Sequence, residues 1–130
     1  YCGTEGPSVS YYDFPGKVWK RFDNPGIEFD VSTPGIFYDM YLILEHKPAM
    51  PFDAFPVTVI MYSPSGEIRS RDISIDPENY TVGEGRIRIP LRKDYAFTEK
   101  GKCTFEIENR SQKVQTHGLI RIGIEMLQPE

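Results

Sequence analysis

The chain has 130 residues, which is a common size for one domain. Its 39% hydrophobic and 13% aromatic residues exclude a disordered chain, and its 20 Ile and Val against 8 Ala and Leu exclude a helical bundle, because β-branched side chains favour strands. The net charge of −4 argues against binding to nucleic acid, and no apolar stretch reaches the roughly 20 residues that span a bilayer.

The chain starts with a small, polar and turn-prone segment over residues 1–13, which we interpret as a flexible tether ahead of a single domain over residues 14–130. A cysteine in such a segment is what a bacterial lipoprotein keeps after its signal peptide is removed. Cys2 is therefore the candidate lipid-attachment residue. The alternative interpretation is an incidental thiol, and the bulky Tyr1 before the cysteine favours that alternative.

Apolar and polar residues alternate with a period of two along the rest of the chain, and turns with Gly or Pro separate these stretches. The pattern predicts an all-β fold, a two-sheet antiparallel β-sandwich of immunoglobulin-like or jelly-roll-like type with about eight strands. The strands include residues 27–31, 37–46, 57–62, 67–75, 86–91, 103–108 and 119–126. A tight turn at residues 63–66 predicts a hairpin, and residues 76–79 are expected to form a plain turn rather than a calcium site.

The segment over residues 37–46 carries the most information about function. One face of this strand is expected to enter the core, with Tyr38, Met40, Leu42 and Leu44. If the strand pairs with residues 57–62, its other face contributes to an exposed patch. The patch would contain Tyr41, Ile60 and Tyr62, with Asp39 and Glu45 at its flanks. Aromatic rings beside carboxylates are typical of sugar-binding or protein-binding surfaces. The alternative is that an N-terminal segment or a loop covers this face.

Two further features have a structural and a functional interpretation. Phe52 and Phe55 lie between prolines, and we expect them to plug one end of the sandwich rather than to form an exposed binding loop. Five arginines are spaced by two or four residues, which places several of them on one solvent face. We expect them to form cross-strand ion pairs rather than to bind nucleic acid. They are Arg69, Arg71, Arg86, Arg88 and Arg92, with Glu106 and Glu108 as candidate partners.

Residues for catalysis or metal binding are sparse. His46 and His117 are the only imidazoles, and Cys103 alternates with Phe105 and Ile107, which predicts a buried thiol. The alternative for Cys103 is a disulfide with Cys2. We therefore expect no enzyme activity, no metal site and no cofactor.

Several motifs resemble those of the GldH family, gliding-motility lipoproteins of Bacteroidetes. The likeness covers most of residues 14–126, including Trp19 ahead of the first long strand. The motifs are residues 37–46, 50–55, 63–66, 83–85, 101–108 and 118–124. This sequence departs from the family pattern at Glu45, where the family tends to have Arg, and at Cys103, which replaces an aromatic residue. It also lacks the usual Trp near Gly83.

The resemblance implies a non-enzymatic envelope lipoprotein that is lipid-anchored through Cys2 at the periplasm or cell surface. It also implies an accessory role in motility or secretion machinery, exerted by contacts with an envelope protein complex. A second hypothesis is a carbohydrate-binding module of a periplasmic or surface lipoprotein, in which Trp19, Tyr41 or Tyr62 stacks on a glycan. A third is a hydrolase with a pair of acidic residues on the open face of the sandwich.

Overall fold

The structure, a computed structural model, describes residues 8–48 and 53–128. Eleven strands lie in this part of the chain, with one turn of 3-10 helix at Pro15–Lys17 and a short helix, α1, at Pro77–Tyr80. The strands are β1 (Ser8–Asp13), β2 (Val18–Lys20), β3 (Gly26–Val31), β4 (Phe37–His46), β5 (Phe55–Tyr62), β6 (Ile68–Ile75), β7 (Thr81–Gly83), β8 (Arg86–Ala96), β9 (Gly101–Asn109), β10 (Gln115–His117) and β11 (Leu119–Leu127).

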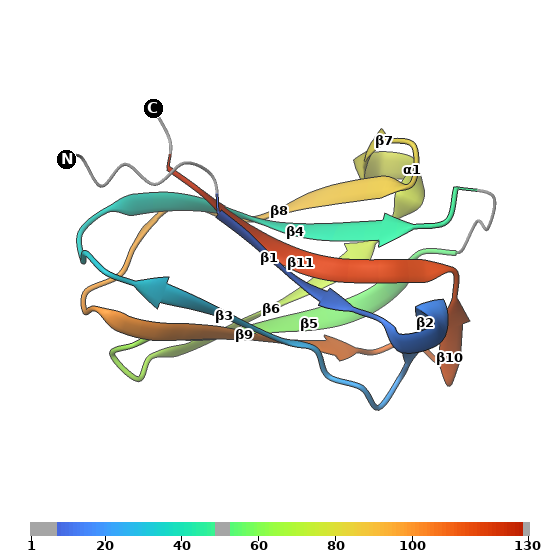
Figure 1. Ribbon diagram of the computed structural model, residues 1–130, viewed down its shortest axis with the longest axis horizontal. Coiled ribbons are helices and arrows are strands. Elements are labelled where there is room, and N and C mark those ends of the chain that lie inside the picture. Colours follow the sequence, from blue (N-terminus) through green and yellow to red (C-terminus); the bar gives the residue numbers. More distant parts are fainter. Residues whose placement is uncertain (1–7, 49–52, 129–130) are drawn as a thin grey trace.

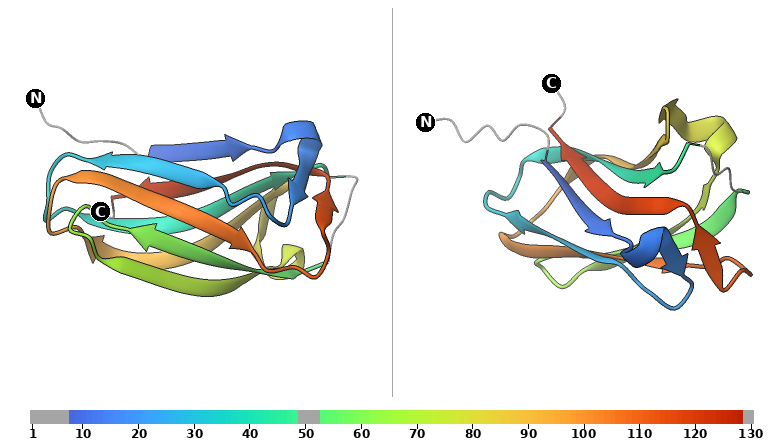
Figure 2. Two further views of the ribbon diagram at one scale, coloured as in Figure 1. Left: turned by 90° about the horizontal axis from the view of Figure 1, so that it is seen from below. Right: turned by 45° about the vertical axis from the view of Figure 1, so that its right-hand side comes forward.

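The predicted all-β character and antiparallel pairing are confirmed. One sheet has five strands in the order β1-β11-β4-β8-β7, and the other has four in the order β3-β9-β5-β6. The two sheets form two layers (Figure 1). The left view of Figure 2 shows the four-stranded sheet from outside. A two-stranded sheet of β2 and β10 lies at one end of the molecule.

Alternating side chains from both sheets build the core between the layers. Buried apolar residues include Leu42 and Leu44 on β4, Val57 and Val59 on β5, and Ile107 on β9. Burial of such side chains stabilises the fold by about 1.5–3 kcal/mol each. The expected inward faces of these strands are therefore confirmed, as is the hairpin, since β5 and β6 pair along their full length.

The strand count is larger than predicted, because four short or peripheral strands escaped the pattern. One of them, β1, contains residues 8–13 of the segment interpreted as a tether, and it pairs with β11. The expected tether is therefore too long by these six residues. Its remainder, with Cys2, lies outside the described residues. Two serines and one aspartate among its six residues weaken the strand signal of β1 in the sequence.

Residues 37–46 and 57–62 do not pair, so the condition for a joint patch is not met. β4 lies in the five-stranded sheet between β11 and β8, whereas β5 lies in the four-stranded sheet between β9 and β6. The chain crosses from one layer to the other between them. The proposed patch is divided as a result, because Tyr41 belongs to one sheet and Ile60 and Tyr62 to the other.

Local deviations have clear physical causes. A register shift between Leu119 and Arg121 places Leu119 in the core, although it is out of phase with the buried Ile122, Ile124 and Met126 of the same strand. At the predicted turn, Asp76 caps the N-terminus of α1 by accepting a hydrogen bond from the Glu78 backbone N–H at 2.9 Å. Phe55 is buried in the core, as expected for a plug, while Phe52 lies outside the described residues.

Candidate functional site

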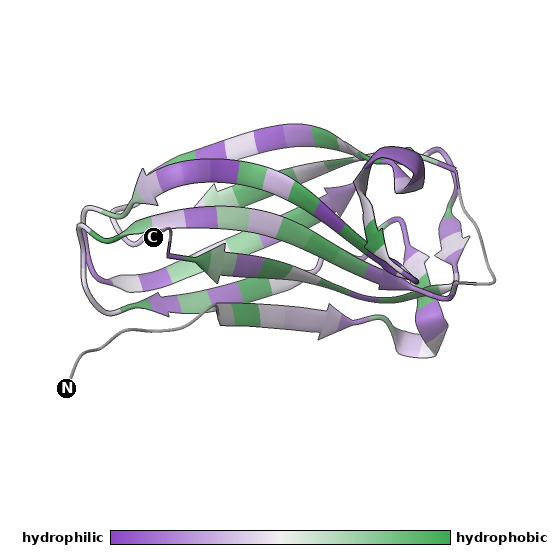
Figure 3. Cartoon of the chain, turned by 90° about the horizontal axis from the view of Figure 1, so that it is seen from above, coloured by the Kyte–Doolittle hydropathy of each residue, from purple (hydrophilic) through white to green (hydrophobic). Residues whose placement is uncertain are grey.

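The outer face of the five-stranded sheet contains three of the predicted site residues and is the first candidate site. Hydrophilic and hydrophobic residues alternate along the strands of this sheet (Figure 3). We call its solvent side the upper face. It consists of Tyr11 on β1, Arg121, Gly123 and Glu125 on β11, Asp39, Tyr41, Ile43 and Glu45 on β4, and Arg86 and Arg88 on β8.

Glu45 lies between two arginines from the neighbouring strands. Arg121 Nε donates to Glu45 Oε1 at 2.8 Å, and Arg86 donates through its guanidinium to Glu45 Oε2 at 3.2 Å. The Glu45 side chain is 20% exposed. Its hydrogen bond and negative charge raise the pKa of Arg121. Both carboxylate oxygens are therefore engaged within the protein.

Tyr41 lies beneath an arginine that crosses its strand. The Arg88 guanidinium carbon is 3.8 Å from the centre of the Tyr41 ring, and Arg88 also reaches Glu125 on the far side of β4 at 2.8 Å. This arrangement combines a cation–π contact with an ion pair. One face of the Tyr41 ring is consequently covered.

The centre of the upper face is closely packed although it faces outward. Ile43 has no exposed surface, and it lies in register with Gly123 and Arg88. A Cβ atom at Gly123 would be 2.6 Å from the backbone oxygen of Ser10 and 2.6 Å from the Tyr11 ring. The missing side chain lets Tyr11 lie against β11, where the Arg121 guanidinium carbon is 4.6 Å from its ring centre. Strand β1 thus covers part of this face. This agrees with the alternative in which an N-terminal segment, rather than a partner, covers the outer face of β4.

Asp39 has a structural partner at the end of the same face. One of its carboxylate oxygens accepts a hydrogen bond from the backbone N–H of Asp94 at 3.0 Å. Asp94 has a left-handed φ of 53°, close to register shifts between β4 and β8. Asp39 therefore supports an unusual backbone conformation of β8.

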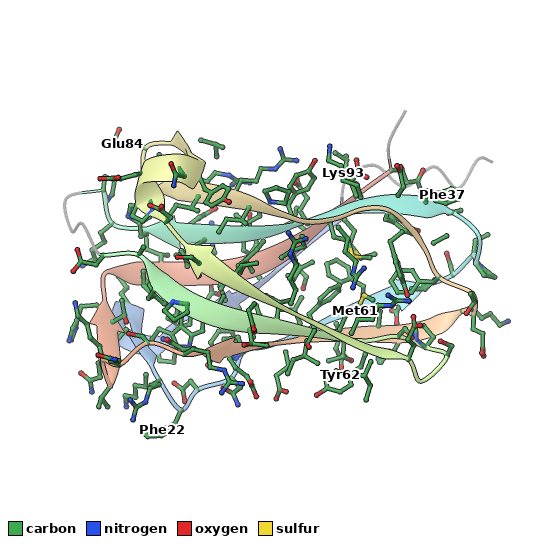
Figure 4. The ribbon with its side chains drawn as sticks, turned by 180° about the vertical axis from the view of Figure 1, so that it is seen from behind. Phe22, Phe37, Met61, Tyr62, Glu84 and Lys93 are labelled. Carbon is green, nitrogen blue, oxygen red and sulfur yellow. The ribbon has the colours of Figure 1, made fainter. Side chains whose placement is uncertain are left out.

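Tyr62 lies on the opposite surface, the outer face of the four-stranded sheet, which we call the lower face. Its side chain points away from the sheet while that of Met61 points between the layers (Figure 4). The Tyr62 hydroxyl donates to Glu106 at 3.3 Å. Desolvation and then the negative charge of Glu106 raise the pKa of Tyr62.

Trp19 cannot serve as a stacking platform, which corrects its predicted role. It has no exposed surface, stacks on Phe14 with ring centres 5.0 Å apart, and donates from Nε1 to the Asp23 backbone oxygen at 2.9 Å. It is a core residue at the end of the sandwich. Of the three aromatic residues proposed to bind a glycan, Trp19 is buried and Tyr41 is covered on one face. Tyr62, which is 37% exposed, remains accessible for such a contact.

Cys103 is a free, buried thiol, as predicted. Burial raises the pKa of this thiol to about 12, so it stays protonated at neutral pH and is a poor nucleophile. In the part of the chain that the structure describes, no three His, Cys, Asp or Glu side chains gather where they could hold a metal ion. No described helix has the length and apolar character needed to cross a membrane.

The ion pairs expected for the arginines are confirmed in part. Arg86 and Arg88 form cross-strand pairs, but with Glu45 and Glu125 rather than with Glu106 or Glu108, which lie on the lower face. Arg121 and Gly123 were missed by sequence reasoning. The alternation of Arg121, Gly123 and Glu125 along β11 could have assigned them to one outer face.

Residues 8–126 match the sequence model of the family described as GldH lipoprotein. A comparison with curated proteins finds no match. One similar solved structure is the VP2 subviral particle of infectious bursal disease virus, with a TM-score of 0.46, 10% identity and 94% of this chain covered. This chain covers 33% of that viral chain, or about a third of its length.

A second similar structure is protein SO0799 from Shewanella oneidensis, with a TM-score of 0.28 and 13% identity. The match covers 92% of this chain and 67% of that chain. At these TM-scores neither structure bears on function.

Proposed function

The chain belongs to the GldH lipoprotein family, and we propose that it is a membrane-anchored protein of the bacterial envelope that acts by protein contacts rather than by catalysis. The observation that carries the proposal is the family match, which extends over residues 8–126. The partners that we propose are components of a motility or secretion complex at the periplasm or cell surface.

The anchor in this proposal is a lipid on Cys2. Five residues separate Cys2 from the first residue of β1, so the linker spans at most about 20 Å when extended. One acyl chain gives only marginal membrane binding, and the proposal therefore requires more than one chain on the cysteine. Confinement to a membrane raises the effective concentration of the domain near its partner.

The chemistry of the described side chains supports a role without a catalytic step. The two carboxylates at the centre of the upper face, Glu45 and Glu125, are held by arginines. The buried Cys103 thiol is protonated at neutral pH because burial raises its pKa to about 12. These groups stabilise the sheet and are not poised to react with a substrate.

Labelling cells with a fatty-acid analogue tests the anchor. We expect label on the full-length protein, loss of the label in Cys2→Ser, and retention in Cys103→Ala, which changes the other cysteine of the chain. Membrane fractionation should show the same pattern. An unlabelled wild-type protein, or label that survives Cys2→Ser, would contradict the proposal.

A further inference from the structure

On one side of the molecule, each sheet has a backbone edge that no strand of the described residues pairs with. β6 is the last strand of the four-stranded sheet, and β8 is bordered on that side only by the short β7, which reaches Arg86 and Ile87. Figure 4 looks at this side, where β6 runs obliquely in front of the space between the layers. Beyond Ile87, the outer edge of β8 has no neighbouring strand among the described residues.

The β6 edge has the properties of a strand that can accept another strand. All eight of its residues pair with β5 without a register shift, and it contains no proline. Most of the strand is exposed, including Ile68 at 62%. A long, regular edge presents a row of backbone N–H and C=O groups, which proteins usually protect. The charged side chains along β6 are Arg69, Arg71 and Asp72.

A groove follows this edge between the two sheets. It has a small apolar hollow of about 20 Å³, lined in part by Met61 and Leu91, and a larger, partly open hollow of about 360 Å³ beside α1, lined in part by Ile73 and Pro90. Arg71 lines both hollows, so they adjoin along β6. The groove is therefore elongated in the direction of the strand.

The apolar hollow is surrounded by three arginines. Arg69 and Arg92 lie on the same tyrosine, with their guanidinium carbons 5.8 and 5.6 Å from the centre of the Tyr95 ring. Arg71 donates to the backbone oxygen of Leu91. Among the described residues, Glu67 is a carboxylate that contacts this group, and it accepts hydrogen bonds from Arg69 and from the Tyr95 hydroxyl, each at 3.0 Å.

Positive charge therefore exceeds negative charge around the hollow. The hydrogen bond from Arg69, followed by that from Tyr95, lowers the pKa of Glu67, which stays ionised and neutralises one arginine. Among residues 8–48 and 53–128, no carboxylate forms an ion pair with Arg71 or Arg92. Carboxylates of a ligand are the natural complement of these two guanidinium groups.

We propose that the β6 edge binds an extended acidic segment of a partner protein. The segment adds to β6 as a further strand, and main-chain hydrogen bonds supply the affinity that does not depend on sequence. Arg69 and Arg71 are two residues apart and share one face of β6, so a paired strand presents acidic residues at every second position. The proposal deepens the protein-contact function proposed above and rests on it for the biological partner.

A binding assay with defined peptides tests this directly. The probe is a fluorescent ten-residue peptide in which Glu alternates with Thr, and its control has Lys in place of Glu. We expect the full-length protein to bind the Glu peptide at least about tenfold more tightly than the Lys peptide. In hydrogen exchange, bound Glu peptide should protect backbone amides of β6. Equal affinities, or protection elsewhere without protection of β6, would overturn the proposal.

Matched variants separate a site from general charge attraction. Changing both Arg71 and Arg92 to Ser, the two arginines near the hollow without a carboxylate partner among the described residues, should weaken binding of the Glu peptide by about tenfold. Arg110→Ser, which removes an exposed arginine paired with Glu108 on the lower face, should change it by less than about twofold. Circular dichroism and thermal unfolding establish that each variant is folded. Equal losses of affinity in the double variant and in Arg110→Ser would overturn the proposal, because they would show general charge attraction without a specific site on β6.

A strand edge can also bind a second copy of the same chain. Size-exclusion chromatography tests whether a second copy binds at this edge. The protein alone is run across a range of concentrations. A dimer that excludes the Glu peptide would overturn the proposal in favour of self-association. The assay uses soluble peptide, so its failure leaves the Cys2 anchor intact, and absence of fatty-acid label leaves the peptide result intact.

Discussion

The two outer faces of the molecule are built from similar residue types, but they differ in how completely the side chains are paired with one another and buried. On the upper face, Glu45 and Glu125 are held by three arginines, two tyrosine rings are covered, and Ile43 is fully buried. On the lower face, the equivalent apolar position, Ile60, is only half-buried, and Tyr62 is 37% exposed.

The difference shows that an outward-facing sheet surface can be either a second packed layer or an open one. β1 and Gly123 close the upper face, because the glycine lets the Tyr11 ring lie directly on the sheet. No described strand does the same for the lower face. We therefore expect substitutions at matched positions to be costly on the upper face and tolerated on the lower one.

The largest difference is expected at the central isoleucines. Ile43→Ala should destabilise the protein by about 2–5 kcal/mol, because it leaves a cavity at a fully buried position of the upper face. Ile60→Ala should cost about 1 kcal/mol or less, because Ile60 is already partly hydrated. Urea unfolding of the two variants measures both values. Equal costs would show that the upper face is not a packed layer.

Two glycines on the outer faces provide the second comparison. Gly123→Ala places a Cβ against the backbone oxygen of Ser10 and should destabilise by about 1–3 kcal/mol. Gly26→Ala has open space on the lower face and should be neutral within about 0.5 kcal/mol. Thermal unfolding gives the comparison, and loss of β1 protection in hydrogen exchange should accompany Gly123→Ala. A neutral Gly123→Ala would mean that β1 is loosely held.

Removing one charge from each face should have a smaller effect. Glu45→Gln keeps the shape of the side chain but leaves Arg86 and Arg121 without their ion-pair partner, and we expect a loss of about 1 kcal/mol. Glu106→Gln on the lower face should change stability by less than about 0.5 kcal/mol. High salt should shrink the effect of Glu45→Gln. A larger loss for Glu106→Gln would reverse the proposed ranking of the two faces.

The smallest effect concerns the titration of Tyr62. Its pKa is raised above 10.0 by desolvation and by the charge of Glu106, so we expect Glu106→Gln to lower it. Because the folded-state pKa is the higher one, any stability from this group is present below pH 10 and is lost as the pH rises through the folded-state pKa. NMR titration of the ring measures the shift, with Glu45→Gln as the control that leaves it unchanged.

Local sequence patterns predicted the core and the hairpin of β5 and β6, but not the pairing of strands that are distant in sequence. The alternation in residues 57–61 and 103–107 identifies buried side chains correctly, because a half-buried strand has a period of two residues whichever strand lies beside it. The placement of β4 and β5 in different sheets depends on contacts distant in sequence, which alternation does not encode. For that reason the predicted patch that joined Tyr41 to Tyr62 was wrong.

In the candidate site, too, sequence spacing predicted local features but not which residues become neighbours in the fold. The ion pairing of Arg86 and Arg88 follows from their spacing, but the identity of their partners depends on which strands are neighbours. Trp19 is typical of a stacking residue by composition alone, and only the packing of Phe14 and Phe55 around it shows that it is buried. The predicted roles of Asp39, Tyr41, Glu45 and Tyr62 in partner binding are untested, and the proposal that the partner binds along β6 competes with them.

Photocrosslinking in cells tests the central claim most directly, namely that a membrane-anchored domain makes its contacts through β6. A photoreactive phenylalanine derivative is placed at Ser70 on β6 or at Tyr41 on the upper face. We expect a discrete crosslinked product from Ser70 that disappears with Cys2→Ser and with the paired changes Arg71→Ser and Arg92→Ser, and none from Tyr41. A product from Tyr41 alone, or one from Ser70 that survives these changes, would contradict the account.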